Sequence, residues 1–460
     1  MVVVNSSNLK LMPVVYLSVE NRSRELSSKL LVACELADRG LTVIIGQQWL
    51  LNENLRFSPK GVVVFKGLNK VQTHNMGFAI NLGHMPVSND EEALGVAKSF
   101  LMTKDVDPEA GLRASRIFTL GEVHQRELMR HTGLPERRLP ITGNPRLDLL
   151  RPEFLTVYDD EVAEIRAEHG PFVLINTNSA GVNSGWGSTE EYRNVLIRIG
   201  WIDPENEDDN ILLEEHLEYD RKNMREIETL ISEISTQMPG QRIVLRPHPS
   251  EDPQHWIDVC ADKPAVTIVP RSDHIPWMMA CEAMVNTGCT TGVEGQMMGV
   301  RTMSLCPDET RWHSFYLANQ VNLRVKTAAD ATGVLKLLRT GTRDLFAETR
   351  EQLMAVMHDN IGAIDDRYAF EQMAEAIAKS FPMTKLNQKI PEFWNDPGYL
   401  TELTRPDYLR EKMTIGEAEI RTQINGLRKA AGKPHDFDIR TLGDSLFMMS
   451  SDRGPLGQQS

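Results

Sequence analysis

The feature that most constrains the fold is an alternation of short apolar runs with helical patterns, which occurs twice along the chain. The apolar runs are typical of buried strands, and the stretches between them carry apolar residues at the spacing of an amphipathic helix. Strands that alternate with helices predict parallel sheets covered by helices on both faces. The predicted strands are residues 13–19, 41–45, 61–65, 85–87 and 116–120 in the first series, and 172–176, 242–246, 266–269, 284–286 and 302–305 in the second. We therefore expect an α/β protein with two doubly wound parallel sheets.

The domain organisation follows from where this alternation stops and restarts. A Gly-Asn-Pro break at residues 142–146 separates the two series. We predict two Rossmann-like domains, over residues 1–150 and 151–330, that face each other across a cleft. A helical C-terminal region is predicted over residues 331–447, and a disordered tail, rich in Ser, Gly and Gln, over residues 448–460.

Composition narrows the class of protein. With 460 residues, 41% of them hydrophobic, the chain can bury ample core, yet no apolar run approaches the roughly 20 residues that cross a bilayer. A net charge of −14 argues against general nucleic-acid binding. The opening Met-Val-Val-Val lacks the basic flank of an export signal, and the five cysteines include no Cys-x-x-Cys pair. We expect a cytoplasmic protein with reduced thiols, no nucleic-acid partner and no metal.

An anion site is predicted where the strand at 284–286 ends. The chain there leads through Gly288 into a helix that starts with the hydroxyls of Thr290 and Thr291. Backbone N–H groups at a helix start bind phosphate, and a glycine lets a ligand approach the backbone closely. Glu294 follows one turn later, where a carboxylate is placed to accept ribose hydroxyls. The alternatives are an N-cap without a ligand and a first-turn acid favoured by the helix dipole.

A second motif, Arg246-Pro-His-Pro249, ends the neighbouring predicted strand. In doubly wound sheets, ligands bind at the carboxyl ends of the strands, so Arg246, His248 and Pro249 are predicted in the same crevice as the helix start. The alternative is a turn in which the imidazole caps the next helix. Together, the two motifs predict a nucleotide or nucleotide-sugar site.

The first domain has its best candidate site in the segment that follows its first strand. Glu20 ends that strand, where a general base or a carboxylate nucleophile is useful. Arg22 and Arg24 are candidates to bind the carboxylate of an acidic sugar, because guanidinium groups make bidentate contacts with planar anions. The alternative is a helix start whose charges neutralise one another.

Further candidates are scattered along the chain. If Glu20 is not the catalytic carboxylate, the alternatives are Glu25, Asp105 and Glu122. Asp105 belongs to an Asp-Val-Asp sequence like that of metal-dependent transferases, although a solvated loop also explains it. The amides that follow the first strand of the second domain are candidates for sugar or acceptor binding, although Asn-rich turns need no ligand. They are Asn176, Asn178 and Asn183.

These motifs resemble those of a known group. The Thr-Gly-Asn-Pro-Arg-Leu-Asp sequence at 142–148, together with the motifs at 246–249 and 288–294, resembles bacterial surface-carbohydrate biosynthesis proteins of the GT-B glycosyltransferase type, over most of residues 13–330. The His-Pro pair with a downstream hydroxyl pair is similar to the motifs by which sialyltransferases and Kdo transferases bind a CMP-activated sugar. The resemblance implies that His248 and the two threonines bind the CMP phosphate.

The resemblance implies a metal-independent, cofactor-free glycosyltransferase. It would move an acidic sugar, Kdo-like or another ulosonic acid, from a CMP-sugar donor onto a capsule, lipopolysaccharide or lipid-linked acceptor. One alternative is a non-hydrolysing nucleotide-sugar epimerase, which also has two such domains, and another is a CDP-glycerol-type polymer transferase. A non-catalytic nucleotide-sugar-binding scaffold stays open. So does peripheral association with the inner membrane or with a polysaccharide assembly complex.

Overall fold

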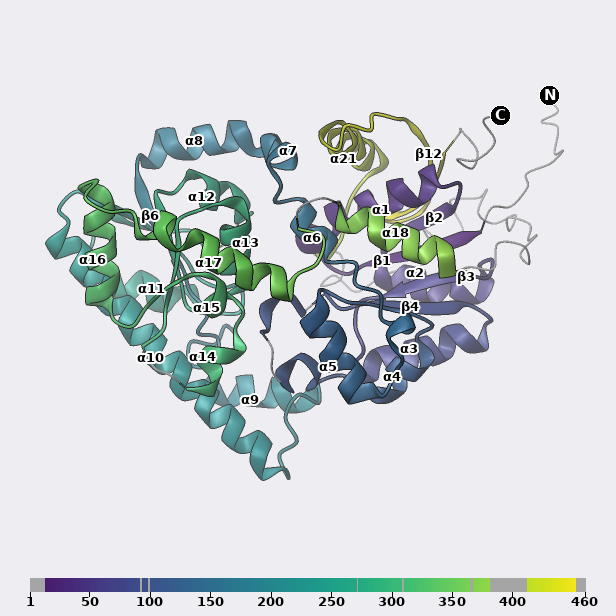
Figure 1. Cartoon of the computed structure of the whole chain (residues 1–460), viewed down its shortest axis with the longest axis horizontal. Helices are drawn as coiled ribbons and strands as arrows, with labels where there is room; N and C mark the ends of the chain where they lie inside the picture. Colours follow the sequence, from purple (N-terminus) through teal and green to yellow (C-terminus); the bar gives the residue numbers. More distant parts are fainter. Residues whose placement is uncertain are drawn as a thin grey trace. The chain divides into compact units, whose positions relative to one another are not determined.

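The structure is a computed structural model that describes residues 13–91, 93–97, 100–270, 272–307, 310–364, 367–380 and 412–451. The chain divides into two compact units, each described here by itself (Figure 1). Unit 1 comprises the described residues of Met1–Glu91, Val106–Leu149 and Ile361–Ser460, and unit 2 those of Glu92–Asp105 and Leu150–Asn360.

Unit 1 is built around a seven-stranded sheet with the order β12-β13-β2-β1-β3-β4-β5. Its strands are β1 (Val14–Val19), β2 (Thr42–Gln47), β3 (Gly61–Phe65), β4 (Met85–Asn89), β5 (Ile117–Phe118), β12 (Phe437–Gly443) and β13 (Leu446–Ser451). Strands β1 to β5 pair in parallel and are buried on both faces, which explains why their sequences are apolar throughout. The strand order reverses between β1 and β3, so ligands are expected at this switch point.

Helices cover both faces of this sheet. Helix α1 packs with α18 and α21 on one face, whereas α3, α4 and α5 pack together on the other (Figure 1). The helices of unit 1 are α1 (Ser27–Asp38), α2 (Gln48–Asn54), α3 (Lys70–Asn81), α4 (Pro108–Arg113), α5 (Glu122–Thr132), α6 (Pro145–Asp148), α18 (Ala369–Ser380) and α21 (Glu417–Ala430), with a π-helical turn, η1 (Arg22–Leu26), before α1. The apolar core between sheet and helices includes Val14, Tyr16, Ile44, Val63 and Met76.

The C-terminal hairpin β12–β13 was not expected from the sequence. It extends the sheet because β13 pairs antiparallel with β2. The pairing is close at Gly46, whose φ is +153° and where a Cβ atom would lie 2.1 Å from the Ser445 carbonyl oxygen. Met448 lies in β13, so the predicted disordered tail does not begin there. Residues 452–460 of that prediction lie outside the described residues.

Unit 2 contains a six-stranded parallel sheet with the order β11-β10-β9-β6-β7-β8. Its strands are β6 (Phe172–Asn176), β7 (Arg242–Arg246), β8 (Val266–Ile268), β9 (Ala283–Asn286), β10 (Thr302–Leu305) and β11 (Leu323–Val325). The chain proceeds outward from β6 to β8 and then returns to β9, which pairs with the other edge of β6. The switch point of this sheet therefore lies between β6 and β9, the strand order of a Rossmann fold.

Helices of unit 2 pack on this sheet around a large apolar core. The helices of this unit are α7 (Pro152–Leu155), α8 (Asp159–His169), α9 (Thr189–Arg198), α10 (Glu207–Gln237), α11 (Pro253–Val259), α12 (Ile275–Ala280), α13 (Thr290–Met298), α14 (Arg311–Phe315), α15 (Ala318–Val321), α16 (Ala328–Arg339) and α17 (Leu345–Asn360). Two smaller apolar clusters lie along α10. Long helix α10 packs on α16, and α12 packs on α8 (Figure 1).

The two Rossmann-like domains confirm the predicted fold class, and each of the ten predicted strands is present. Strand β11 was missed because it is only three residues long and carries a charged residue. Predicted residues 331–447 do contain helices, but α16 and α17 belong to unit 2 and α18 and α21 to unit 1. Within the described residues, every helix is too short or too polar to cross a bilayer.

A buried carboxylate caps helix α18 in the C-terminal segment of unit 1. Asp148 accepts hydrogen bonds from the backbone N–H groups of Ala369 (3.0 Å) and Phe370 (2.8 Å), so it caps α18 from a distant part of the chain. We predict that Asp148→Ala lowers the free energy of unfolding by about 1–2 kcal/mol, the range for a lost helix cap. Denaturant titration checks this value. Asp436→Ala, at an exposed position of the same unit, is the control, and equal stability of the two variants would contradict the capping role.

Candidate nucleotide site and carboxylate cluster

The first candidate site lies at the start of α13, at the switch point of unit 2. Asn286 ends β9 and locks the turn, because its side chain accepts from the Gly288 N–H (3.0 Å) and donates to the Met303 carbonyl (3.0 Å). Gly288 has φ +90°, and a Cβ atom there would lie 2.9 Å from the ring of Tyr316. The N-cap residue Cys289 makes no side-chain hydrogen bond to the first turn. The helix start therefore presents backbone donors as an anion site does.

The ends of three strands lie level beside this helix start. Asn176 of β6 is paired with Asn286 on one side and with Arg246 on the other. The amide of Asn176 donates to the Thr291 hydroxyl (3.1 Å), which ties β6 directly to α13. The structure therefore places Arg246, Asn176 and the two threonines at one edge of one sheet, as the sequence predicted.

Two further side chains belong to this edge, and one of them was not predicted. Glu294 is 5% exposed, and His274 donates a 2.7 Å hydrogen bond from Nε2 to its carboxylate. Burial opposes the charge on His274, but the attraction of Glu294 and of Asp273 outweighs this opposition and raises the pKa of His274. Arg246 is held by the carbonyl (2.7 Å) and the hydroxyl (3.1 Å) of Ser272.

The turn at His248 has a defined geometry. The N–H of Ser250 donates to Nδ1 of the imidazole (3.2 Å), and the N–H of Glu251 donates to the His248 carbonyl (2.8 Å). A neutral imidazole that accepts at Nδ1 carries its proton on Nε2. The side chain of His248 is half-buried. Because Nδ1 accepts, Nε2 is the ring nitrogen that donates, which is the role that phosphate binding requires. Pro249 is exposed in the same turn.

The predicted charges of the first domain are engaged inside unit 1. Glu20 forms ion pairs with Lys66 and with Lys412, the latter at 3.2 Å. Arg22 pairs with Glu419 and donates to the carbonyl of Thr414 (2.8 Å). These contacts support the alternative interpretation of this segment, a helix start whose charges are neutralised by ion pairs.

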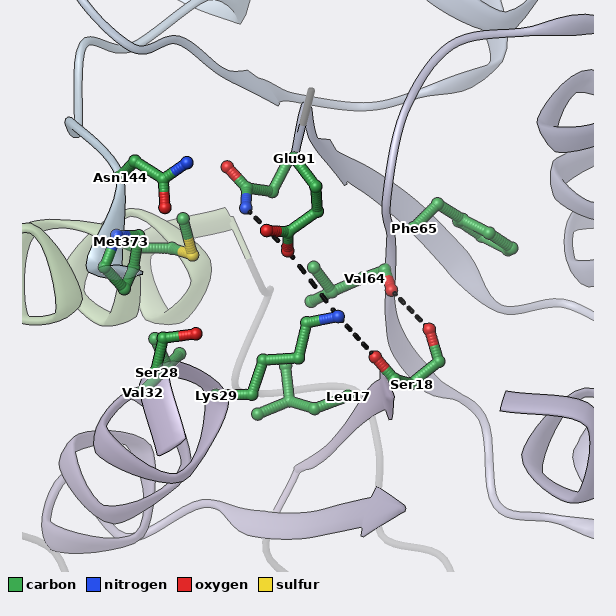
Figure 2. A pocket seen from close by; sticks show the side chains of 12 residues that line it. Leu17, Ser18, Ser28, Lys29, Val32, Val64, Phe65, Glu91, Asn144 and Met373 are labelled. Atoms are coloured by element: carbon green, nitrogen blue, oxygen red, sulfur yellow. Dashed lines mark hydrogen bonds and ion pairs between the residues drawn. The ribbon is translucent and has the colours of Figure 1, made fainter. Parts of the chain in front are cut away.

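Glu25, in contrast, belongs to a buried cluster at the switch point of unit 1. The ammonium of Lys29 lies 2.7 Å from Glu25. It also lies 3.5 Å from Glu91 and 2.7 Å from the Ser18 carbonyl (Figure 2). Arg24 lies 3.4 Å from the same Glu25 carboxylate. Burial disfavours the charge on Lys29, but the two carboxylates outweigh it and raise the pKa of Lys29.

A small cavity adjoins this cluster. Its volume is about 20 Å³, enough for roughly one water molecule. Lys29, Glu91, Ser18 and Asn144 are among the residues that line it (Figure 2). Asn89 donates to the Glu91 carboxylate (3.1 Å) and fixes its orientation. The cavity lies where β1 and β3 end, which is the expected ligand edge of this sheet.

The remaining predicted residues lie elsewhere. Asp105 is exposed in unit 2, whereas Asp107 belongs to unit 1, where it caps α4 and accepts from Thr73 (2.6 Å). Glu122 is an exposed first-turn residue of α5. Asn178 is half-buried near the end of β6, and Asn183 donates to Glu251 and to the Asp252 carbonyl. The Asp-Val-Asp pair is thus not assembled as one carboxylate site.

Sequence reasoning missed Lys29, Glu91 and His274. Glu25 and Lys29 are four residues apart, the spacing of neighbours on a helix, and this signal was available. The acidic run at 90–92 is separated from the predicted fourth strand by two residues and was a second signal. His274 is twenty residues from its partner Glu294, and no local pattern joins them. Within the described ranges, no group of three or more His, Cys, Asp or Glu residues is arranged to hold a metal.

Comparison with solved structures shows the same fold. A putative UDP-N-acetylglucosamine 2-epimerase from Listeria monocytogenes matches with a TM-score of 0.52 at 12% identity, over 83% of this chain and 100% of that one. The UDP-GlcNAc 2-epimerase of Methanocaldococcus jannaschii matches with a TM-score of 0.47 at 12% identity, over 80% and 99%. The wall teichoic acid polymerase TagF matches with 0.43 at 11% identity, over 80% and 88%. No protein-family model and no curated protein sequence matches.

Two Rossmann-like domains of this kind define the class as a GT-B-type fold. At this level of identity the likeness establishes the fold, and the function rests on the sites themselves.

The His274–Glu294 ion pair predicts a pH dependence of stability. Because the folded-state pKa of His274 is raised, its contribution is fully present below the unfolded value of about 6.5. The contribution is lost as pH rises through the folded value. We expect the melting temperature to fall with rising pH above about 6.5, and to fall less in His274→Gln and in Glu294→Gln. Parallel slopes in the wild type and both variants would contradict the ion pair. Thermal scans across this range provide the measurement.

Proposed function

We propose that this chain is an enzyme of nucleotide-activated sugars that binds the nucleotide phosphate at the start of α13. The observation that carries the proposal is that β9, β6 and β7 end level at one edge of the sheet. These ends carry the helix start, the Thr291–Asn176 pair and the Arg246–His248 turn. The donors there are cationic or neutral, and they suit a phosphate without requiring a metal. Glu294, which His274 orients, is proposed to accept hydrogen bonds from the ribose hydroxyls.

The chemistry that follows is cleavage of the bond between the sugar and the nucleotide. Negative charge develops on the departing phosphate oxygen, and fixed donors aimed at that oxygen stabilise the transition state. The backbone N–H groups of α13 and the Nε2 proton of His248 are the proposed donors. This step is common to sugar transferases and to non-hydrolysing epimerases. A CDP-glycerol-like donor is instead cleaved between its two phosphates, where the same donors would face the departing phosphate oxygen.

Of these reactions, we favour epimerisation of a nucleotide sugar. The solved structure that matches with a TM-score of 0.52, over the whole of its own length, is described as a putative epimerase. A transferase with a CDP-glycerol-like donor is the second candidate, because the TagF polymerase has the same fold. The expected CMP-linked ulosonic acid has no counterpart among the three proteins named above.

Either reaction needs a group that moves a proton, at the sugar carbon in epimerisation or at the acceptor hydroxyl in transfer. We propose Glu91 for this role in place of Glu20. Glu91 lines the water-sized cavity at the switch point of unit 1, and one lysine, Lys29, lies 3.5 Å from its carboxylate. Glu20, in contrast, is paired with two lysines. Lys29 is proposed to hold the Glu91 carboxylate in position.

The first test of this function is nucleotide binding. A ligand at a concentration 100 times its dissociation constant stabilises a protein by about 2.7 kcal/mol. We expect UDP or CDP to raise the melting temperature clearly more than adenosine or guanosine diphosphate does. The effect of UDP or CDP should shrink in a Thr290→Val, Thr291→Val double variant. If no nucleotide shifts the melting temperature, the nucleotide site does not exist.

The reaction type is tested by incubating the enzyme with UDP-GlcNAc alone and following the sugar by NMR spectroscopy. An epimerase produces a second sugar nucleotide without any acceptor. Release of the nucleotide only after an acceptor is added would favour the transferase and contradict the epimerase.

The catalytic carboxylate is tested by matched substitutions. Glu91→Gln keeps size but removes the basic carboxylate, so kcat should fall about a hundredfold, a typical general-base contribution. Glu20→Gln, the control at the site first expected from sequence, should lose much less. Steady-state kinetics of both variants decide between them, and a larger loss in Glu20→Gln would restore the original assignment.

A further inference from the structure

Glu251 combines deep burial with an unusual number of donors. Glu251 lies in the turn between β7 and α11 and is 4% exposed. The carboxylate accepts from Thr177 Oγ1 (2.7 Å), Ser179 N (2.9 Å), Asn183 Nδ2 (3.3 Å), Trp256 Nε1 (2.9 Å) and His248 N (3.4 Å). Burying a carboxylate is costly unless it is hydrogen-bonded, so these donors account for its presence in the interior.

The donors come from separate parts of unit 2. Two loops meet at Glu251: the loop after β6 and the turn after β7 that carries His248. Backbone bonds reinforce the junction, from Gly185 N to the Ser250 carbonyl (2.8 Å) and from Asp252 N to the Asn183 carbonyl (3.1 Å). Glu251 therefore joins the end of β6, where Asn176 contacts Thr291, to the turn of the imidazole.

The same residue sets the orientation of the imidazole through the turn. Glu251 receives the His248 N–H on its side chain and donates its own N–H to the His248 carbonyl. This closed turn places the Ser250 N–H against Nδ1 of the ring, which keeps the proton on Nε2. A change at Glu251 is thus transmitted to the atom that, in the proposed function, faces the phosphate.

We propose that Glu251 is a positioning residue for nucleotide binding, which acts by fixing the tautomer and the direction of His248. This inference rests on the proposed function of His248. It differs from a purely structural role, in which Glu251 would stabilise unit 2 without affecting the ring.

Asp220 provides a matched control. It is also a buried carboxylate, 1% exposed, and it ties the same loop after β6 by accepting from the Gly181 N–H (3.0 Å). Burial raises the pKa of Asp220 well above its usual range. Asp220 is hydrogen-bonded to the loop, whereas Glu251 is bonded both to the loop and to the turn of His248. Loss of loop anchoring alone should therefore appear in both variants, and loss of imidazole positioning only in Glu251→Gln.

The experiment compares Glu251→Gln, Asp220→Asn, His248→Ala and the Glu251→Gln, His248→Ala double variant. Titration calorimetry measures binding of UDP, CDP and CMP, and two-bond ¹H–¹⁵N NMR spectra report the tautomer of His248. If Glu251→Gln unfolds because its new N–H group opposes the donors at Oε2, adding Trp256→Phe removes the nearer of these two donors, the other being Asn183 Nδ2.

We expect Glu251→Gln to weaken binding of the preferred nucleotide at least about tenfold, as His248→Ala does, with no further loss in the double variant. The His248 spectrum should lose its single Nε2–H form, and Asp220→Asn should change neither quantity. Normal affinity and an unchanged spectrum in Glu251→Gln, or losses that multiply in the double variant, would overturn the positioning role alone. Normal affinity in His248→Ala would overturn the proposed role of His248, and the inference with it.

Discussion

The structure of the candidate site depends on how the end of β9 is fixed to the start of α13. Asn286 uses both ends of its side-chain amide to hold the turn, and Gly288 takes a left-handed conformation that also avoids the ring of Tyr316. Because β6 and β9 are neighbours whose connections leave in opposite directions, this turn opens at the switch point of the sheet. The start of α13 therefore lies at the same sheet edge as the ends of β6 and β7.

The sequence was sufficient to predict the features that are local. Central strands are buried on both faces, so β1 and β6 are apolar runs that are visible without a structure. The hairpin β12–β13 was less visible, because its strands gain stability only by pairing with each other and with the edge of β2. The helix start at Thr290 was predictable for the same reason as the strands, since glycines and hydroxyl residues mark it locally.

Contacts between distant residues were beyond this kind of prediction. The carboxylate of Glu91 meets Lys29, whose other partner Glu25 is a near neighbour in the chain, only after α1 and the end of β4 have assembled. Glu20 has the better position on paper, at the end of a strand, but Lys66 and Lys412 approach it in the folded unit. Charge pairing that emerges from the fold, rather than position along the chain alone, decides the surroundings of each carboxylate.

The central claim is that a nucleotide phosphate binds at the start of α13, and a crystal structure of the protein with UDP or CDP tests it most directly. The account predicts phosphate oxygens at about 2.7–3.2 Å from backbone N–H groups of the first turn of α13, with Nε2 of His248 as a further donor. A nucleotide whose phosphates lie away from α13, with Thr290 and Thr291 making no contact, would contradict it.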